Sequence, residues 1–561
     1  MTDAGEIAVN TEPESCKVAD SQAYDLVVIG GGINGVGIAA DAAGRGLKVL
    51  LCERGDLASG TSSKSSKLIH GGLRYLEHLE FRLVREALAE REVLLNKAPH
   101  IIWPLRFILP HRPHLRPAWL IRLGLFFYDH LAKRTRLQGS RLLKIDAGSP
   151  LKQAIHLGFE YSDAWVMDAR LVLLNAIQAR ELGARILTQT PCIRAERQGK
   201  RWRVELQHKG QNVEIEAKAL VNAAGPWVSQ IFESELQTRA PKHVRLVKGS
   251  HLVVKRIHTE PNAYILQNTD GRIVFVLPFE GDYSLIGTTD VEFEGDAGQA
   301  EISESEIDYL LAVVNQHFRS QLDRQAILHS FSGVRPLIQD AKTQAQSISR
   351  DYELVLETES ESAPLLSVFG GKLTTYRKLA EAALTKLSPY FPKMGRCWTE
   401  FLYLPGGDFS SKAALTSQFS QDYAFLPLDL IDRYVSCYGT LAHRFLSGKS
   451  TLAELGQDFG HGLFEAEVRY LMEQEWAESV EDILWRRTKL GLKFSEPEAA
   501  SLEVYLNRTS GKVKLEDNAL SEGDALMEEE KPDVAAGHGY EAIGNGVENT
   551  ATEDPAADSS A

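Results

Sequence analysis

The sequence predicts an α/β protein that combines a parallel sheet, a second, antiparallel sheet and a helical C-terminal region. Three observations predict this fold class. A short apolar strand, a glycine-rich turn, an alanine-rich helix and another strand follow one another between residues 24 and 53. Several β-rich segments cluster between residues 249 and 290, and after about residue 395 the pattern becomes helical. A β-α-β unit favours a parallel sheet, whereas clustered strands favour an antiparallel one.

The first unit contains a glycine-rich turn between the strands YDLVVIG (24–30) and KVLLCE (48–53). Gly30, Gly32 and Gly35 fit the spacing G-x-G-x-x-G, which allows a tight turn, close approach to a pyrophosphate and close helix–strand packing. Glu53 ends the second strand, where an acid binds ribose hydroxyls. The unit therefore predicts dinucleotide binding over a simple tight loop. The acid disfavours NADP and does not separate NAD from FAD.

The remaining elements follow from periodicity and end signals. Residues 81–100 predict a helix that stops at Pro99, and residues 167–184 predict another that leads into the strand RILTQT. ALVNAAG (219–225) is typical of a buried strand. SHLVVK, AYILQN, RIVFVLPF and YSLIGTTD predict the antiparallel sheet. Ser303 and Glu306 have the spacing of a capping box, and residues 364–387 predict a strand, a glycine turn and a helix.

Composition excludes several classes of protein. The chain has 561 residues and a net charge of −14, but residues 511–561 carry thirteen acids and three lysines, so the rest has a net charge of only −4. The acidity of the chain argues against general nucleic-acid binding, which needs a basic face. Its five cysteines are scattered, without the spacing of a zinc site, which indicates a reducing compartment and no metal. No signal peptide or transmembrane helix is expected.

Several distant motifs together resemble one family. They are GGGINGVGIAADAAGRG (30–46), TSSKSSKLIHGGLRYLEH (61–78), EALAEREVL (86–94), LPHRPHLRPAW (109–119), VNAAGPW (221–227), SGVRPL (332–337), SVFGGKLTTYRKLAE (367–381), DFGHGLFEAE (458–467) and LWRRTKLG (484–491). They are similar to those of the FAD-dependent glycerol-3-phosphate dehydrogenases, specifically the aerobic, quinone-linked bacterial type. The resemblance extends from about residue 24 to 510.

The resemblance implies the fold and the boundaries of the region between the two ends of the chain, and composition predicts the leader and the tail, which the resemblance leaves out. A flexible leader (1–22) precedes an oxidoreductase region (23–394), in which a Rossmann-like FAD domain of the glutathione-reductase type comprises about 23–100, 165–230 and 330–394. Antiparallel cap segments at about 101–164 and 231–329 interleave with it and form the substrate domain. A helical C-terminal domain (395–510) and an acidic disordered tail (511–561) follow.

The resemblance also implies FAD as the cofactor. NAAGPW then corresponds to the second strand end at the flavin, and GGKLTT to the turn that meets the isoalloxazine ring. The residues expected to bind FAD are Gly30, Gly32, Ile33, Asn34, Gly35, Glu53, Thr61, Ser62, Ser65, Ser66, Ala224, Gly225, Gly371, Leu373 and Thr374.

The implied reaction is oxidation of sn-glycerol 3-phosphate to dihydroxyacetone phosphate, with hydride passing from C2 to the flavin. His70 and Arg335 match the catalytic positions, and either of them takes the hydroxyl proton. The expected substrate-binding residues are Arg74, Tyr75, Arg350 and Lys372. Arginine forks suit a phosphate dianion. Without the resemblance, each of these residues would be read as an ordinary surface or packing residue.

Residues 106–136 combine seven Lys/Arg and one acid with interleaved aromatic and aliphatic residues. This pattern is typical of an interfacial membrane helix, and the alternative is a partly buried amphipathic helix. With a quinone as electron acceptor, the membrane interpretation is favoured. We expect a monotopic protein on the cytoplasmic face of the cell membrane, which contacts lipid through Arg112, Arg116, Trp119, Arg122, Phe126 and Arg134.

Two other functions compete with this interpretation. A glycerol-phosphate oxidase would use the same substrate motifs and pass electrons to oxygen, giving H2O2. A non-catalytic, flavin-binding regulatory protein is the alternative from a different class, and the full set of site residues argues against it. The expected partners are glycerol 3-phosphate, ubiquinone or menaquinone, and a lipid surface, with no nucleic acid. The oligomeric state is left open, a homodimer being one option.

Overall fold

The computed structural model describes residues 23–112, 117–338, 351–358 and 362–523. The predicted leader, most of the predicted acidic tail, Arg116 and Arg350 lie outside these ranges. The chain divides into two compact units, Met1–Asn507 and Arg508–Ala561. The architecture below is that of the first unit.

The first sheet contains the glycine-rich turn. Its strands run in the order β17 (Tyr352–Glu357), β18 (Leu365–Gly370), β10 (Gln211–Asn222), β1 (Ala23–Ile29), β2 (Val49–Cys52) and β7 (Arg185–Leu187). Pairing is parallel from β18 to β7, and the antiparallel strands β8 (Cys192–Gln198) and β9 (Arg201–His208) extend it beside β10. β1 lies in the middle and is buried on both faces, as its continuous apolar run predicts.

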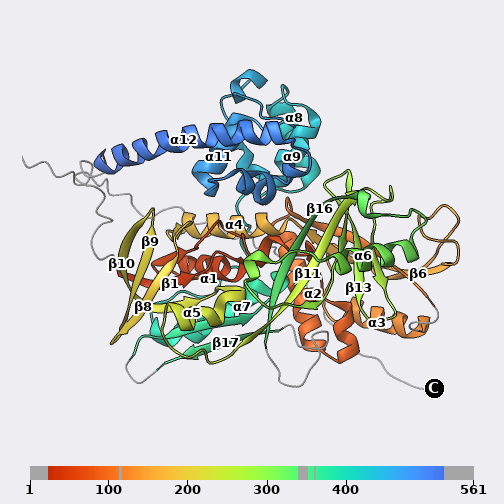
Figure 1. Cartoon of the computed structure of the whole chain (residues 1–561), viewed down its shortest axis with the longest axis horizontal. Coiled ribbons are helices and arrows are strands. Elements are labelled where there is room, and N and C mark those ends of the chain that lie inside the picture. Colours follow the sequence, from red (N-terminus) through yellow and green to blue (C-terminus); the bar gives the residue numbers. More distant parts are fainter. Residues whose placement is uncertain (1–22, 113–116, 339–350, 359–361, 524–561) are drawn as a thin grey trace, which may run out of the picture. The chain divides into compact units, whose positions relative to one another are not determined.

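Helices cover the first sheet and bring distant segments together. α1 (Ile33–Gly44) contacts α4 (Asp168–Glu181) and α7 (Tyr376–Leu387), and small residues of α1 allow close packing. Figure 1 shows α4 between α1 and the C-terminal helix α11 (Glu465–Glu475), and α4 contacts both. Two further α-helices are α2 (Phe81–Lys97) and α5 (Val228–Ser234). The predicted helices at 81–100 and 167–184 are confirmed.

The second sheet is antiparallel except for the pairing of β4 (Ile102–Pro110) with β12 (Ala263–Gln267), which confirms the predicted class of this region. It lies beside the first sheet, on the right in Figure 1. Helix α6 (Glu304–His317) begins at Ser303 with the predicted capping box. The strand order is β15 (Val291–Glu292), β11 (Val244–Lys255), β14 (Tyr283–Gly287), β13 (Ile273–Phe279), β12 (Ala263–Gln267), β4 (Ile102–Pro110), β6 (Leu157–Val166) and β3 (Leu68–Ile69), with β16 (Ile327–Ile338) beside β11 and β5 (Arg141–Lys144) beside β6.

Two strands, β3 and β16, pair within the second sheet, although the predicted boundaries place them wholly or mostly in the FAD domain. β3 pairs with β6, and β16 pairs with β11 along most of its length. β3 and residues 330–338 of β16 were expected in the FAD domain, at 23–100 and 330–394, while residues 327–329 were expected in the cap. The physical reason is that a strand's alternation identifies which of its faces is buried but not which strand it pairs with.

The C-terminal region is helical, as predicted. Its elements are α8 (Lys412–Asp422), α9 (Leu428–Tyr438), α10 (His443–Leu446), α11, a π-helical turn (Asp482–Arg487) and α12 (Glu496–Gly523). α12 continues past residue 510, where the disordered tail was expected to begin. Residues 511–523 are rich in helix-forming Lys, Leu, Glu and Ala, which explains the longer helix. Within the described residues, none of the helices combines the length and apolar character that crossing a bilayer requires.

The basic, aromatic segment 106–136 is helical only in part, which corrects the expectation of one interfacial helix. Residues 106–110 belong to β4, and the helix is α3 (Ala118–His130). The alternation in RFILP favours the strand, and Pro110, Pro113 and Pro117 keep the helix from beginning earlier.

Candidate functional site

A cavity of about 620 Å³ lies between the glycine-rich turn, the loop after β2 and the second sheet. Its volume is within the range of sites for small molecules and cofactors. Every predicted cofactor residue except Gly35 lines it. The segments that meet there include the ends of β1, β2, β10 and β18, so the cavity lies at the carboxyl edge of the parallel strands.

The glycine-rich turn requires its glycines for steric reasons. Gly30 has φ +113°, and a Cβ there would lie 2.6 Å from the carbonyl oxygen of Ala223. A Cβ on Gly35 would lie 1.9 Å from the carbonyl oxygen of Gly30. Gly35 therefore acts by letting α1 pack against β1, which is the role that the spacing predicts for the third glycine.

The start of α1 fits a bound pyrophosphate. Gly32 is the N-cap of the helix and provides no side-chain cap, while the Ser62 hydroxyl accepts a hydrogen bond from the Ile33 amide at 3.0 Å. The Asn34 side chain donates to the Gly370 carbonyl at 3.2 Å, and its own Oδ1 is buried without a partner. An open helix N-terminus attracts anions, and a buried acceptor needs a donor. These groups fit FAD.

Glu53 shapes the turn as well as lining the cavity. Its carboxylate accepts hydrogen bonds from the Gly31 amide at 2.6 Å and the Gly55 amide at 2.9 Å. Burial raises the pKa of Glu53, and the two amides oppose this shift. The side chain therefore ties β2 to the glycine turn at the position expected to meet ribose hydroxyls.

The predicted substrate end lies in the same cavity. His70, Tyr75, Arg335 and Lys372 all line it. The Lys372 ammonium lies 4.2 Å from the centre of the Tyr75 ring, a cation–π contact, and the His70 ring meets Phe275 edge-on. Tyr75 and Arg74 belong to the short helix η2 (Leu73–His78), but the Arg74 side chain, like Arg350, is outside the described part of the structure.

Arg335 is oriented by an acid that the sequence interpretation missed. The Arg335 guanidinium donates to Asp290 at 2.5 Å and to the Thr288 hydroxyl at 3.0 Å. A Cβ on Gly249 would lie 2.5 Å from the guanidinium, so glycine leaves room for it. Asp290 also lines the cavity. The signal for it is the sequence TTD after a strand of the predicted sheet, although no local pattern pairs it with Arg335.

Buried partners fix the loop between the cofactor and His70. Asp168, at the start of α4, accepts hydrogen bonds from the Ser65 hydroxyl at 2.7 Å and the Lys67 ammonium at 2.9 Å. Ser66 pairs with the His251 ring at 2.9 Å. Burial, with help from the nearby Arg335 and Lys67 cations, lowers the pKa of His251 well below 6.5, so the ring is neutral. The sequence interpretation missed both Asp168 and His251.

A second buried network holds the backbone beside His70. The Gly71 amide donates to the Tyr128 hydroxyl at 2.8 Å, and Tyr128 donates to Asp163 at 2.7 Å. Arg91 also donates to Asp163, at 2.5 Å. Gly72 follows with φ +72°, a conformation that favours glycine. The His-Gly-Gly sequence thus forms a turn whose backbone is fixed by the buried network of Tyr128, Asp163 and Arg91.

The residues predicted to contact lipid differ in their exposure and in their polar partners. α3 buries Ile121, Leu125 and Tyr128 and exposes five large apolar side chains. Of the predicted arginines, Arg122 donates to the Ser140 carbonyl at 3.3 Å and Arg134 pairs with Asp129 at 3.1 Å. Arg112 is partly buried, and Arg116 lies outside the described residues. The exposed apolar residues are Trp119 (68%), Leu120, Leu123, Phe126 (53%) and Phe127.

Comparison with known proteins gives two family matches. Residues 25–377 match the family described as FAD dependent oxidoreductase. Residues 397–508 match the C-terminal domain of alpha-glycerophosphate oxidase.

Three relatives extend over most of the chain. It is 57% identical to glycerol-3-phosphate dehydrogenase of Pseudomonas aeruginosa, covering 87% of this chain and 95% of that protein. It is 54% identical to aerobic glycerol-3-phosphate dehydrogenase of Escherichia coli, covering 86% and 97%. It is 51% identical to D-erythritol 1-phosphate dehydrogenase of Brucella abortus, covering 89% and 99%.

A solved structure is also similar. The crystal structure of glycerol-3-phosphate dehydrogenase from Bacillus halodurans complexed with FAD matches with a TM-score of 0.65 and 26% identity, covering 87% of this chain and 94% of that one.

Proposed function

Because the chain belongs to the family of FAD-dependent glycerol-3-phosphate dehydrogenases, we propose that it oxidises sn-glycerol 3-phosphate to dihydroxyacetone phosphate and passes the electrons to a membrane quinone. The observation that carries the proposal is the single cavity in which the cofactor residues meet His70, Tyr75, Arg335 and Lys372. FAD, when bound, supplies the two-electron acceptor for the hydride that leaves C2. The other requirements fall on the side chains of the chain itself.

The first requirement is a site for a phosphate dianion beside a secondary alcohol. Lys372 and Arg335 supply positive charge in the described part of the cavity, and Arg74 and Arg350 are proposed to add to it. Tyr75 lies under the Lys372 ammonium and limits where this cation points. Charge-assisted hydrogen bonds of this kind are strong and directional.

The second requirement is a group that takes the hydroxyl proton. Arg335 stays charged because Asp290 pairs with it and because a guanidinium does not lose its proton in proteins. It is therefore proposed to polarise the hydroxyl oxygen, while His70, an imidazole in the same cavity, accepts the proton. Substrate loses a hydride from C2 and a proton from oxygen and becomes the ketone.

The third requirement is access to the quinone. The exposed apolar face of α3 continues to Phe81, whose ring lies 5.9 Å from that of Phe127, and to Leu79, which is 73% exposed. Apolar side chains beside basic ones suit the surface of an anionic bilayer. We propose that this face rests on the cytoplasmic side of the membrane and that quinone is reached from there.

The test of the reaction is a spectrum. Under anaerobic conditions, glycerol 3-phosphate is expected to bleach the flavin absorbance of the purified protein, and a soluble quinone analogue is expected to restore it. A flavin that stays oxidised with substrate would overturn the proposed activity.

Two further measurements separate the alternatives. Hydrogen peroxide formed in air as fast as quinone is reduced would favour the oxidase. D-erythritol 1-phosphate is the second candidate substrate, because a relative with 51% identity carries that name. A kcat/KM for D-erythritol 1-phosphate above that for glycerol 3-phosphate would reassign the substrate.

The membrane surface has its own test with a matched control. Trp119→Ser with Phe126→Ser is expected to reduce binding to anionic vesicles at least tenfold while leaving flavin reduction intact. Phe401→Ser removes an aromatic ring that is 80% exposed in the C-terminal region and is expected to leave binding unchanged. Equal binding by all variants would favour an α3 that only packs against its own domain.

A further inference from the structure

A buried carboxylate joins the cofactor loop to the C-terminal region. Asp56 is three residues beyond Glu53 and is 4% exposed. It accepts hydrogen bonds from Arg486 Nε at 2.5 Å and from one Arg487 nitrogen at 2.8 Å, and a second Arg487 nitrogen pairs with it as well. Two guanidinium groups from one π-helical turn therefore meet a single acid.

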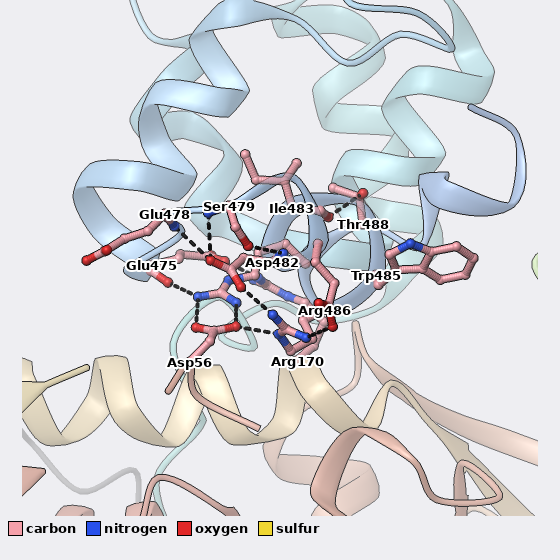
Figure 2. Close-up of polar contacts among 12 residues, drawn as sticks. Asp56, Arg170, Glu475, Glu478, Ser479, Asp482, Ile483, Trp485, Arg486 and Thr488 are labelled. Atoms are coloured by element: carbon pink, nitrogen blue, oxygen red, sulfur yellow. Dashed lines mark hydrogen bonds and ion pairs between the residues drawn. The ribbon is translucent and has the colours of Figure 1, made fainter. Parts of the chain in front are cut away.

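The arginines are themselves fixed from the C-terminal side. Arg486 pairs with Asp482 and with Glu481, and Asp482 accepts from the amides of Glu478 and Ser479 at 2.8 Å. Figure 2 shows Asp56 pointing up from the loop into this group. Each of these charged side chains therefore has at least one partner of opposite charge.

Asp56 lies in a turn that presses against the glycine-rich loop. The Ala58 amide donates to the Gly31 carbonyl at 3.1 Å, and the Ser59 amide donates to the Asp56 carbonyl at 3.1 Å. Ala58 has a positive φ of 63°, which is costly for a residue with a Cβ and needs support from its surroundings. The next residues along the chain, up to Ser62, line the cofactor cavity.

The C-terminal region holds a second element behind the same cavity. Arg170 of α4 pairs with Glu475 and donates to the Cys437 carbonyl at 2.9 Å. α4 begins at Asp168, which fixes Ser65 and Lys67. Both the turn after Glu53 and the loop around Ser65 are thus anchored to the helical region by buried ion pairs.

We propose that Arg486 and Arg487 are positioning residues for the cofactor, because they hold Asp56 and, through it, the turn that carries the FAD-binding loop. Among the described residues that line the cavity, neither arginine nor Asp56 is present, so they act through the backbone and not by touching FAD. The inference concerns cofactor retention and stands whichever substrate or electron acceptor the enzyme uses.

The physical basis is the penalty for leaving a buried charge unpaired. With Asp56 neutralised, the Arg487 guanidinium loses its carboxylate partner in a site that excludes water, while Arg486 keeps Asp482 and Glu481. The turn then moves to give Arg487 other partners or solvent. FAD binds the loop in its ordered conformation. When the loop is loosened, only a fraction of the molecules keep this conformation, and the apparent affinity for FAD falls in proportion to that fraction.

The experiment measures FAD affinity separately from turnover. Apoprotein of Asp56→Asn, prepared from the full chain, is titrated with FAD by flavin fluorescence. We expect the dissociation constant of FAD to rise at least tenfold. At the same FAD concentration, added FAD should raise the melting temperature of Asp56→Asn by less than it raises that of the parent, because stabilisation by a ligand grows with the ratio of its concentration to its dissociation constant.

The matched control breaks a buried ion pair that does not reach the loop. Glu467 is fully buried and pairs with Arg433 at 2.6 Å inside the C-terminal region. Glu467→Gln should lower the melting temperature, keep the FAD dissociation constant within twofold of the parent value, and gain as much stability from added FAD as the parent does. If Glu467→Gln weakens FAD as much as Asp56→Asn, or if neither variant weakens it, the proposal is overturned.

A milder variant keeps the test informative if Asp56→Asn does not fold. Asp482→Asn removes one partner of Arg486 and leaves the Asp56–Arg487 pair in place. Its FAD dissociation constant should rise about threefold, between those of the parent and Asp56→Asn. A value equal to the parent, with a lowered melting temperature, would assign the network to stability alone.

Discussion

The cations that line the cofactor cavity, which we call those in front of it, are less buried than the cations that lie behind the cavity loops. Arg335 lines the cavity, keeps 23% of its side chain exposed and is paired with Asp290. Lys67, Arg170 and Arg487 lie behind the loop, at most 2% exposed, and each pairs with a carboxylate that is itself buried. The comparison indicates that fully buried, paired charges stabilise the fold, whereas a partly exposed charge in the cavity is placed to bind an anion.

The largest effect is expected from a charge behind the cavity. Asp168→Asn leaves the Lys67 ammonium buried without its carboxylate, which costs about 3–5 kcal/mol of unfolding free energy. Urea unfolding followed by circular dichroism would measure it. The double variant Lys67→Met with Asp168→Asn should recover part of the loss, since no unpaired cation remains. A single variant within 1 kcal/mol of the parent would remove the distinction between the two groups.

A charge in front of the cavity should affect rate and leave stability alone. Arg335→Ala is expected to lower kcat/KM about 100- to 1,000-fold, as for loss of one group that stabilises developing charge, with FAD content and melting temperature unchanged. Arg335→Lys should recover part of the rate. Arg324→Ala, at an exposed arginine just before the same strand, is the control and should leave kcat/KM intact. Loss of FAD from Arg335→Ala would contradict the assignment.

Acid should reveal a buried anchor in the second sheet. Burial acts to raise the pKa of Glu306, but hydrogen bonds from Lys248, Thr289, Ser303 and Ser250 outweigh it and lower the pKa from 4.5 to about 2. The folded pKa is depressed, so the stabilisation is present above pH 4.5 and is lost as pH falls toward 2.

The measurement is unfolding free energy against pH for the parent and for Glu306→Gln. The parent should lose about 2 kcal/mol more than the variant between pH 5 and pH 2.5. Parallel curves would mean that Glu306 does not supply this stabilisation.

The smallest effect is expected from an exposed ion pair remote from the cavity. Arg201 and Glu216 lie on neighbouring strands, and each side chain is 46% exposed. Arg201→Ala should change the unfolding free energy by less than about 1 kcal/mol, because solvent screens the pair. A loss as large as that of Asp168→Asn would show that burial is not what sets the scale.

Local patterns predicted the elements and the cofactor turn well. The glycine spacing identified the residues of the cavity around Gly30 and Gly32, and helical periodicity identified α2, α4 and α6. Each of these signals lies within one short window of sequence, where geometry is set by neighbours along the chain.

Pairings between distant residues could not be predicted in the same way. Asp56 and Arg487 are separated by 431 positions, and nothing in either segment names the other. The same holds for Asp290 with Arg335, and for β16, whose alternation fits either sheet. The family resemblance supplied His70 and Arg335, while Asp163 behind the Gly71 backbone and Asp290 beside Arg335 were left out because they carry no motif.

The order of strands in the first sheet has a consequence for how the enzyme is made. β1 pairs with strands at residues 49–52 and 211–222, and β10 pairs in turn with β18 at 365–370. Contacts this distant along the chain form slowly, because the entropy of closing a long loop is lost before the contact contributes any stabilisation. A nascent chain that has not yet reached Gly371, Leu373 and Thr374 lacks one wall of the cavity. The cofactor cavity is therefore complete only after β18 and the turn that follows it have been synthesised.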